Sequence, residues 1–237
     1  MSTTVGEVPL TLITLPDGTR MECARGEEWI AKHNRESLVH VPDPLRHVVD
    51  IGAHVGFTAL PAARRGAHVI AIEANPWTFA TLCRNVQRNA LCDRVTPIHA
   101  AVVTCPAVPM QLAELRSRFR NIGAAGLVQP MQQPVVGRAL SMWWYKIPAM
   151  SPHQIDYLKM DIEGYEHTLI PEMINWIAGW VRYLALEIHD VENRPAYHAD
   201  DARNVDLVTF LATNGFERVT GTEQLWRNTR QLAEVTA

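Results

Sequence analysis

The stretch RHVVDIGAHVG, residues 46–56, decides the fold. It begins as a run of apolar and β-branched residues, which is typical of a buried strand. It then changes abruptly to Asp50 and two glycines, Gly52 and Gly56. Glycines allow the backbone to turn sharply where a strand ends, so a helix can follow at once. The stretch therefore predicts the first strand and the start of the first helix of an alternating fold.

Strands and helices continue to alternate beyond this stretch. Because continuous apolar strands that alternate with helices form parallel sheets, we expect a parallel sheet with helices on both faces. A hairpin formed by FERV and EQLWRN would close the sheet. The expected strands are residues 46–52, 68–74, 94–102, 155–161 and 181–190, and the expected helices follow the first strand and cover 76–90, 164–179 and the segment before Gly215. Pro61 must lie in the first turn of its helix or bend it.

Two segments depart from this rhythm. Residues 9–23, PLTLITLPDGTRMEC, predict a hairpin around the turn signal PDG, and residues 27–35 predict a short helix. We therefore expect an N-terminal extension over residues 1–45 and a single domain over 46–237. Within the domain, prolines and glycines interrupt residues 104–153, which predicts an irregular insertion with one or two edge strands.

Composition limits the class of protein. The chain has 237 residues, of which 47% are hydrophobic and 20% are charged, and its net charge is −3. Without a basic block, the charge argues against nucleic-acid or membrane binding that is mainly electrostatic. The four cysteines form no CxxC pair, which fits a reduced intracellular protein without a cysteine zinc site. We expect a cytoplasmic protein with no membrane or nucleic-acid partner, and a homodimer is left open.

A first candidate site follows from the glycine turn. Glu73 ends the second expected strand, 23 residues after Asp50, where an acid can accept hydrogen bonds from both hydroxyls of a ribose. Dinucleotide folds use GxGxxG to hold a pyrophosphate, whereas this turn has GxxxG behind an acid. The pattern therefore favours S-adenosyl-L-methionine over a nicotinamide dinucleotide. The alternative is a strand–helix turn that binds nothing.

A second candidate site lies in YLKMDIEGYE, residues 157–166, and in LEIHD, residues 186–190. Asp161 ends one strand, and Glu187 and His189 end the next on one face, so the three should converge beyond the carboxyl ends of the strands. They could bind a hard divalent ion such as Mg²⁺. Without a metal, His189 could act as a general base that an acid orients. Glu163 and Glu166 could instead be explained by attraction to a helix N-terminus, and for Glu166 this is the preferred explanation.

Four segments carry a resemblance to a known family. In chain order they are DIGAHVG (50–56), IEANP (72–76), KMDIEGYE (159–166) and LEIHD (186–190). Together they resemble the FkbM family of S-adenosylmethionine-dependent methyltransferases over roughly residues 46–190. His54 stands where the family usually has Asn, Ala74 where it has Pro, and Ser141 where it often has Asp.

The resemblance implies a Rossmann-like class I methyltransferase fold. Its seven-stranded sheet would have the order 3-2-1-4-5-7-6, and only one strand of the last hairpin would run antiparallel. The activity implied is O-methylation of a hydroxyl on a sugar, saccharide or secondary metabolite. The expected cofactor-binding residues are Asp50, Gly52, His54, Gly56, Glu73, Ala74 and Asp161, the expected catalytic residues are His189, Asp161 and His54, and the expected metal ligands are Asp161, Glu187 and His189.

Two other functions remain open at this point: a nicotinamide-dependent oxidoreductase of similar fold and a non-catalytic S-adenosylmethionine-binding module. The aromatic segment MWWYK (142–146) and the loop 191–204 could close over a sugar, or they could be core and exposed loop respectively.

Overall fold

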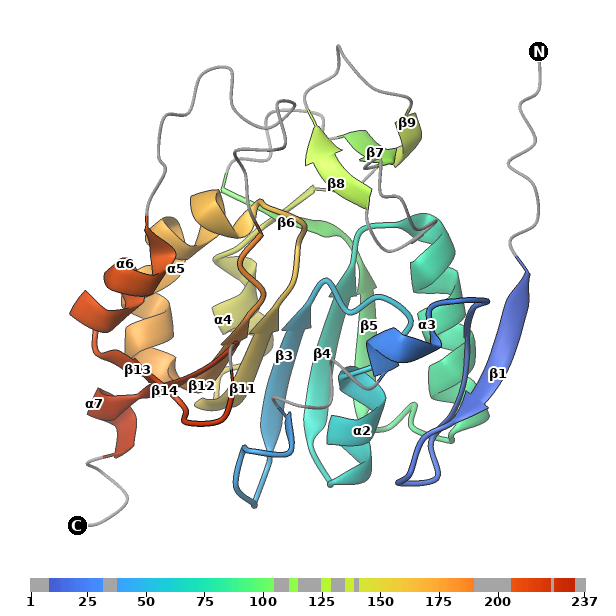
Figure 1. The fold of residues 1–237 in the computed structure, drawn as a ribbon, viewed down its shortest axis with the longest axis horizontal. Coiled ribbons are helices and arrows are strands. Elements are labelled where there is room, and N and C mark those ends of the chain that lie inside the picture. Colours follow the sequence, from blue (N-terminus) through green and yellow to red (C-terminus); the bar gives the residue numbers. More distant parts are fainter. Residues whose placement is uncertain are drawn as a thin grey trace.

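A seven-stranded sheet forms the centre of the protein in the computed structural model (Figure 1). The structure describes residues 9–31, 38–104, 111–114, 125–128, 135–138, 141–189, 206–222 and 224–232, with only the backbone for the three short ranges between 111 and 138. The strands of the sheet are β3 (His47–Ile51), β4 (His68–Glu73), β5 (Val95–His99), β11 (Ile155–Met160), β12 (Val181–Leu186), β13 (Phe216–Arg218) and β14 (Leu225–Asn228).

The sheet has the order β13-β14-β12-β11-β3-β4-β5. Numbered as the seven expected strands, this order is 3-2-1-4-5-7-6. Strands β3, β4, β5, β11 and β12 pair in parallel, whereas β14 is antiparallel to both β12 and β13. The carboxyl ends of β3, β4, β11 and β12 therefore meet at one edge of the sheet.

Helices cover both faces of the sheet, as the sequence predicts (Figure 1). Consecutive residues of β3 point into different cores: Val48 packs with Leu60 and Leu82 of α2 and α3, and Val49 packs with Leu169 of α5. The described helices are α2 (Ala59–Arg64), α3 (Pro76–Arg88), α4 (Lys146–Met150), α5 (Glu166–Trp180), α6 (Leu207–Thr213) and α7 (Thr229–Leu232). None of these helices has the length and apolar character that crossing a membrane requires.

Prolines and caps act at helix ends as expected. Pro61 is the third residue of α2, and Pro76 is the first residue of α3. The side chain of Asn75 accepts a hydrogen bond from the amide of Trp77 at 2.9 Å, which caps α3. Gly215 follows the last residues of α6 with a φ of 89°, the left-handed conformation that ends many helices.

The N-terminal hairpin packs beside α3. Strands β1 (Leu10–Thr14) and β2 (Arg20–Ala24) pair antiparallel around the predicted turn. Asn85 of α3 accepts a hydrogen bond from the amide of Glu22 at 2.7 Å and donates to the carbonyls of Glu22 and Val55, each at 2.9 Å. The hairpin is thus joined to the glycine turn that follows β3. Of the helix expected over residues 27–35, residues 28–31 are helical and 32–35 fall outside the described residues.

The strand expected over residues 94–102 is divided in two, which corrects the prediction. β5 ends at His99, opposite Glu73, because Glu73 is the last residue of β4. The amide of Ala100 donates to the carbonyl of Glu73 at 3.1 Å, and the chain then leaves the sheet. Residues Ala101–Val103 form β6, which pairs in parallel with β10 (Ser141–Trp143).

The insertion is more regular than the sequence predicts. Strands β7 (Gln111–Glu114), β8 (Ala125–Val128) and β9 (Val135–Arg138) form a three-stranded antiparallel sheet above the carboxyl ends of the central strands (Figure 1). With β10, the described residues of the insertion form four strands, so the expectation of one or two edge strands was wrong. Its short apolar patches mark strands, although the prolines and glycines between them suggested irregular structure.

Candidate active site

The turn after β3 lies directly against the end of β11. The amides of Gly52 and Ala53 donate to the carbonyl of Ile72 at 2.9 and 3.0 Å. Gly52 has a φ of 81°, and a Cβ atom added there would lie 1.8 Å from the carbonyl oxygen of Asp161. Only glycine fits this position, because the backbones of two strand ends approach each other. The glycine turn therefore sets the distance between the two predicted sites.

Gly56 serves the packing of the neighbouring helices. Its φ is 101°, and an added Cβ would lie 2.2 Å from Leu60 and 2.9 Å from Leu82. Side chains of α2 and α3 therefore occupy the space that a larger residue would need. Contacts within the protein account for this glycine, which the resemblance places among the expected cofactor-binding residues.

Glu73 is a buried acid that organises the end of β4. Its carboxylate accepts hydrogen bonds from the amides of His54 and Asn75, both at 2.7 Å. Burial raises the pKa of Glu73, and the hydrogen bonds from Asn75 and His54 partly oppose that shift. Each carboxylate oxygen has a second lone pair, so the group can still accept bonds from a ligand. Glu73 thus joins the glycine turn to the end of the neighbouring strand.

His54 is a largely buried ring within the glycine turn. It has a φ of 51°, and its ring stacks on Phe57 with centroids 5.5 Å apart. Among the described residues, neither ring nitrogen has a hydrogen-bond partner, and the nearest carboxylate oxygen, on Glu27, lies 3.7 Å from Nε2. Burial lowers the pKa of His54 to about 4, so the ring is neutral at pH 7. A ring with this pKa is a weak base.

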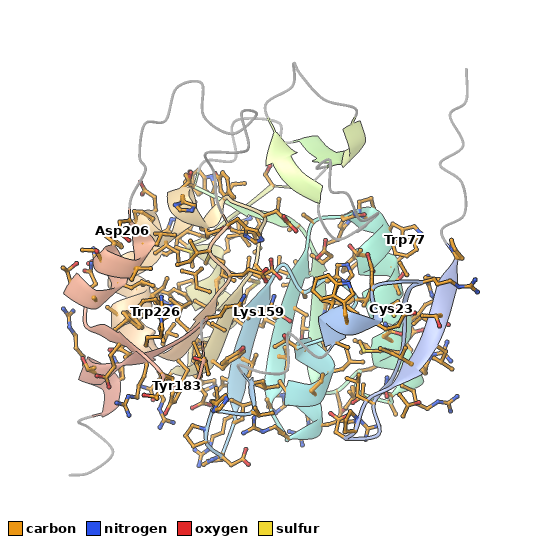
Figure 2. The ribbon with its side chains drawn as sticks, viewed as in Figure 1. Cys23, Trp77, Lys159, Tyr183, Asp206 and Trp226 are labelled. Atoms are coloured by element: carbon orange, nitrogen blue, oxygen red, sulfur yellow. The ribbon has the colours of Figure 1, made fainter. Side chains whose placement is uncertain are left out.

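Lys159 is a buried cation on β11, near the middle of the central sheet (Figure 2). The Lys159 amine lies 2.9 Å from the Asp161 carboxylate. In the parallel pairing of β11 with β3, Lys159 lies opposite Asp50 along the backbone. Burial alone would lower the pKa of Lys159, but Asp161 and Asp50 raise it above its ordinary value. Conversely, burial alone would raise the pKa of Asp161, but Lys159 and then His189 hold it below its ordinary value. Asp161 is therefore a carboxylate at neutral pH.

Asp50 is the most deeply buried acid of the glycine turn, with 1% of its surface exposed. Burial raises its pKa to about 6, although Lys159 opposes the shift. Both carboxylate oxygens of Asp50 are buried and have no hydrogen-bond partner among the described residues.

Four carboxylates surround His189 (the acidic cluster: Asp161, Glu163, Glu166 and Glu187). Its Nδ1 lies 2.8 Å from Glu166, and its Nε2 lies 3.7–3.8 Å from carboxylate oxygens of the other three. Burial opposes the charged ring, but the hydrogen bond to Glu166 and the charges of Glu166, Glu163 and Asp161 raise the pKa of His189 to about 9. The acids are thus compensated by two protein cations, His189 and Lys159.

The structure brings together the three residues predicted as a metal site. Single ligand atoms of Asp161, Glu187 and His189 all lie within 4.8 Å of one another. The reason for their proximity differs from the predicted one, because β12 ends at Leu186 and both Glu187 and His189 lie in the segment beyond it. The amide of Glu187 donates to the carbonyl of Met160 at 3.1 Å, which keeps this segment beside the end of β11.

Two further residues of the site were missed. Lys159 interrupts an apolar strand, and that unusual position is a signal that the sequence analysis did not use. Glu166 was assigned to the helix N-terminus alone, yet it is fully buried and binds His189. No local pattern identifies its partner, because that partner lies 23 residues away.

Aromatic side chains form a wall next to the glycine turn. Trp143 packs with Ala74 and Tyr165 in a small apolar cluster, and its indole nitrogen is buried with no partner among the described residues. Tyr145 lies edge-on to Trp143, with centroids 4.5 Å apart, and is 46% exposed. The loop 191–204 lies outside the described residues.

Comparison with known proteins identifies the class. The fold is similar to that of the *Pyrococcus horikoshii* TYW2 structure in complex with MeSAdo, with a TM-score of 0.50, 16% identity, and coverage of 93% of this chain and 69% of the other. It is also similar to the N-terminal domain of human METTL16 in complex with SAH, with a TM-score of 0.42, 14% identity, and coverage of 84% and 66%. At 16% identity, the likeness to the TYW2 structure shows a shared Rossmann-like fold.

The family is more specific. The Methyltransferase FkbM domain matches residues 50–217, well over half of the 237 residues, and the protein belongs to that family. This membership rules out the nicotinamide-dependent oxidoreductase. Among curated proteins, the tRNA (guanine(37)-N(1))-methyltransferase of *Danio rerio* is 43% identical over 60 residues, which are 25% of this chain and 12% of that protein. The chain thus matches a small part of that relative's length.

Proposed function

We propose that the protein transfers a methyl group from S-adenosylmethionine to a hydroxyl oxygen of a small acceptor, such as a sugar, a saccharide or a secondary metabolite. The observation that carries this proposal is the position of His189, whose Nε2 faces Asp161 and Glu187 beside the glycine turn. A hydroxyl needs a group that removes its proton or lowers its pKa, and this cluster offers both kinds of group.

The cofactor would lie along the glycine turn, against Gly52, Glu73, Ala74 and Asp161. Two buried polar groups support a ligand there, since the ring nitrogens of His54 and the indole nitrogen of Trp143 have no partner among the described residues. S-adenosylmethionine supplies a methyl group that its sulfonium already activates. The protein therefore has mainly to align the acceptor and manage its proton.

The proton has two candidate acceptors. Asp161 is ionised at neutral pH and can accept a hydrogen bond from the hydroxyl. His189 can take the proton only after it has lost its own, because its pKa is raised to about 9. A divalent ion such as Mg²⁺, held by Asp161, Glu187 and His189, would replace that proton and would lower the pKa of a bound hydroxyl. His54, whose pKa is lowered to about 4, is neutral at pH 7 and is also a weak base.

A second candidate is methylation of RNA, which the local identity to the *Danio rerio* tRNA methyltransferase favours. It conflicts with our expectation of no nucleic-acid partner. The net charge of −3 still argues against a binding surface that depends mainly on phosphate contacts. We place hydroxyl methylation first because the acidic cluster would repel a nucleic-acid backbone.

The test combines cofactor binding with an acceptor panel. Calorimetry with S-adenosylhomocysteine should show binding, and labelled S-adenosylmethionine should then be offered with monosaccharides, oligosaccharides, phenolic and aliphatic alcohols, nucleosides and tRNA transcripts. We expect label in a hydroxyl compound, loss of transfer in Asp161→Asn, and retained binding of S-adenosylhomocysteine. Label in tRNA alone would overturn the hydroxyl proposal, and binding without transfer to any acceptor would favour a non-catalytic module.

The metal is tested in the same assay. If Asp161, Glu187 and His189 hold a divalent ion, excess EDTA should abolish transfer and Mg²⁺ should restore it. Full activity in EDTA would remove the metal from the mechanism.

A further inference from the structure

Glu166 is the most completely buried acid of the cluster around His189. It is the first residue of α5, and none of its surface is exposed. One carboxylate oxygen accepts a hydrogen bond from the amide of Gly164 at 2.8 Å. The other accepts two bonds from His189, from its amide and from its ring Nδ1, each at 2.8 Å.

A role at the helix N-terminus explains only part of this arrangement. Such a role needs bonds to nearby amides, as with Gly164. Two of the three hydrogen bonds go instead to one residue beyond β12, 23 positions along the chain. The carboxylate therefore connects the start of α5 to the segment that carries His189.

The neighbouring residue holds the same segment from another direction. His167 Nε2 lies 2.9 Å from the carbonyl oxygen of His189 and can donate to it. The first turn of α5 thus contacts the amide, the carbonyl and the ring of His189. Few orientations of the ring satisfy all three contacts.

The contact at Nδ1 also determines where the ring presents its other nitrogen. A carboxylate only accepts hydrogen bonds, so the bond to Glu166 requires a proton on Nδ1. Nε2 then faces Asp161, Glu163 and Glu187, with nitrogen–oxygen distances of 3.7–3.8 Å. Nε2 is therefore the ring nitrogen that is directed at the proposed acceptor, and it is the nitrogen that can bind or release a proton or another ligand.

We propose that Glu166 is a positioning residue of the methyl-transfer site: it holds His189 with Nδ1 protonated and Nε2 directed at the acceptor. This inference rests on the proposed function, because that function assigns the acceptor site to His189. The same orientation serves a proton or a divalent ion at Nε2, since buried carboxylates also orient histidines that bind metals.

A double-mutant cycle tests the inference with the acceptor that the panel identifies. Loss of a hydrogen bond to a charged group should lower kcat of Glu166→Ala by about 10- to 150-fold. The kcat of Glu166→Gln should lie between those of Glu166→Ala and the wild type, because an amide oxygen can still accept a hydrogen bond from His189. Glu172→Ala, on the exposed side of the same helix, is the matched control and should keep wild-type kcat.

The cycle separates positioning from simple stabilisation of the helix. If Glu166 acts through His189, the double variant Glu166→Ala/His189→Ala should be no slower than His189→Ala alone. Losses that multiply, or a loss of S-adenosylhomocysteine affinity equal to the loss of kcat, would overturn the inference.

A second measurement needs no acceptor. In protein with ¹⁵N-labelled histidine and bound S-adenosylhomocysteine, the His189 Nδ1 proton should be protected from exchange with water. It should lose that protection in Glu166→Ala, which has no acceptor for the bond, and keep it in Glu172→Ala. Unchanged protection in Glu166→Ala would overturn the inference. A different outcome would refute the role that the proposed function gives to His189. In that outcome, His189→Ala keeps full transfer, while protection of the Nδ1 proton in protein that retains His189 still depends on Glu166.

Discussion

At the scale of single residues, the site depends on how closely two strand ends approach. Gly52 leaves no space for a Cβ atom beside Asp161, and its backbone is left-handed. Gly66 has a similar φ of 96°, but nothing lies within 4 Å of its added Cβ. The two glycines therefore separate the effect of conformation from the effect of close approach.

We expect Gly52→Ala to destabilise the fold much more than Gly66→Ala. The left-handed conformation should cost roughly 1–2 kcal/mol at either position. At Gly52, displacement of the β11 backbone should add about 2 kcal/mol or more. Urea unfolding of both variants measures the difference. Equal losses would show that the approach of Asp161 relaxes without cost.

His54 makes stability depend on pH in the acid range. Its folded pKa of about 4 lies below the usual value of 6.5, so the folded state binds fewer protons than the unfolded state between these pH values. Stability is therefore lost as the pH falls from about 6.5 to 4, on the order of 3 kcal/mol.

His54→Asn should remove this loss. Asparagine does not titrate here, and it tolerates a φ of 51°. The test is the difference between the unfolding free energies of the wild type and His54→Asn, measured from pH 7 to pH 4. Both proteins contain Asp50, so its contribution cancels in that difference. A constant difference across that range would contradict the assigned pKa.

The sequence predicted the convergence of Asp161, Glu187 and His189 because parallel strands bring their carboxyl ends to one edge. It could not predict the partners of these residues. Whether a buried lysine faces Asp50 depends on the register of two strands that are distant in sequence. Likewise, the contact between Glu166 and His189 depends on how α5 packs.

At the scale of elements, Asn85 connects three segments. It is fully buried in α3 and hydrogen-bonds to β2 and to Val55 in the glycine turn. The N-terminal hairpin is thus fixed to the cofactor side of the domain by polar contacts as well as by apolar packing.

Asn85→Ala should lower the unfolding free energy by about 2–4 kcal/mol, because it leaves buried backbone groups of Glu22 and Val55 without partners. We also expect weaker binding of S-adenosylhomocysteine, since the glycine turn loses a support. Asn89→Ala is the comparison: its side chain also contacts β2, through Arg20, but at an exposed position. Equal effects of the two variants on affinity would argue against the support.

Element boundaries were the least predictable feature. The strand and helix pattern is strong in residues 46–103, yet β5 stops at His99 because its partner β4 ends opposite. In the same way β12 stops at Leu186, although its sequence continues with an alternating pattern. In both cases the pairing partner, rather than the strand's own residues, determines where the strand ends.

At the scale of the whole molecule, the acidic cluster makes the free energy of unfolding decrease at alkaline pH. The folded pKa of His189 is about 9, above the usual 6.5, so the folded state binds the additional proton between these values. This contribution is fully present below pH 6.5 and is lost as the pH rises through about 9, on the order of 3 kcal/mol.

Unfolding measured from pH 6 to pH 10 should therefore show a decline in the wild type that His189→Gln lacks. The four carboxylates of the cluster remain in the variant, so it should be less stable than the wild type at pH 6 and closer to it at pH 10. A variant that follows the wild-type curve in parallel would show that another group causes the decline.

The pairing of β6 with β10 has a consequence for how this protein could diversify. The insertion leaves the core after Val103 and returns at Ser141, and these two stems lie side by side in one short parallel ladder. Segments of other lengths and sequences can be exchanged between such stems without disturbing the central sheet. The segment between these stems could therefore change in length and sequence during evolution while the central sheet and its strand ends are kept.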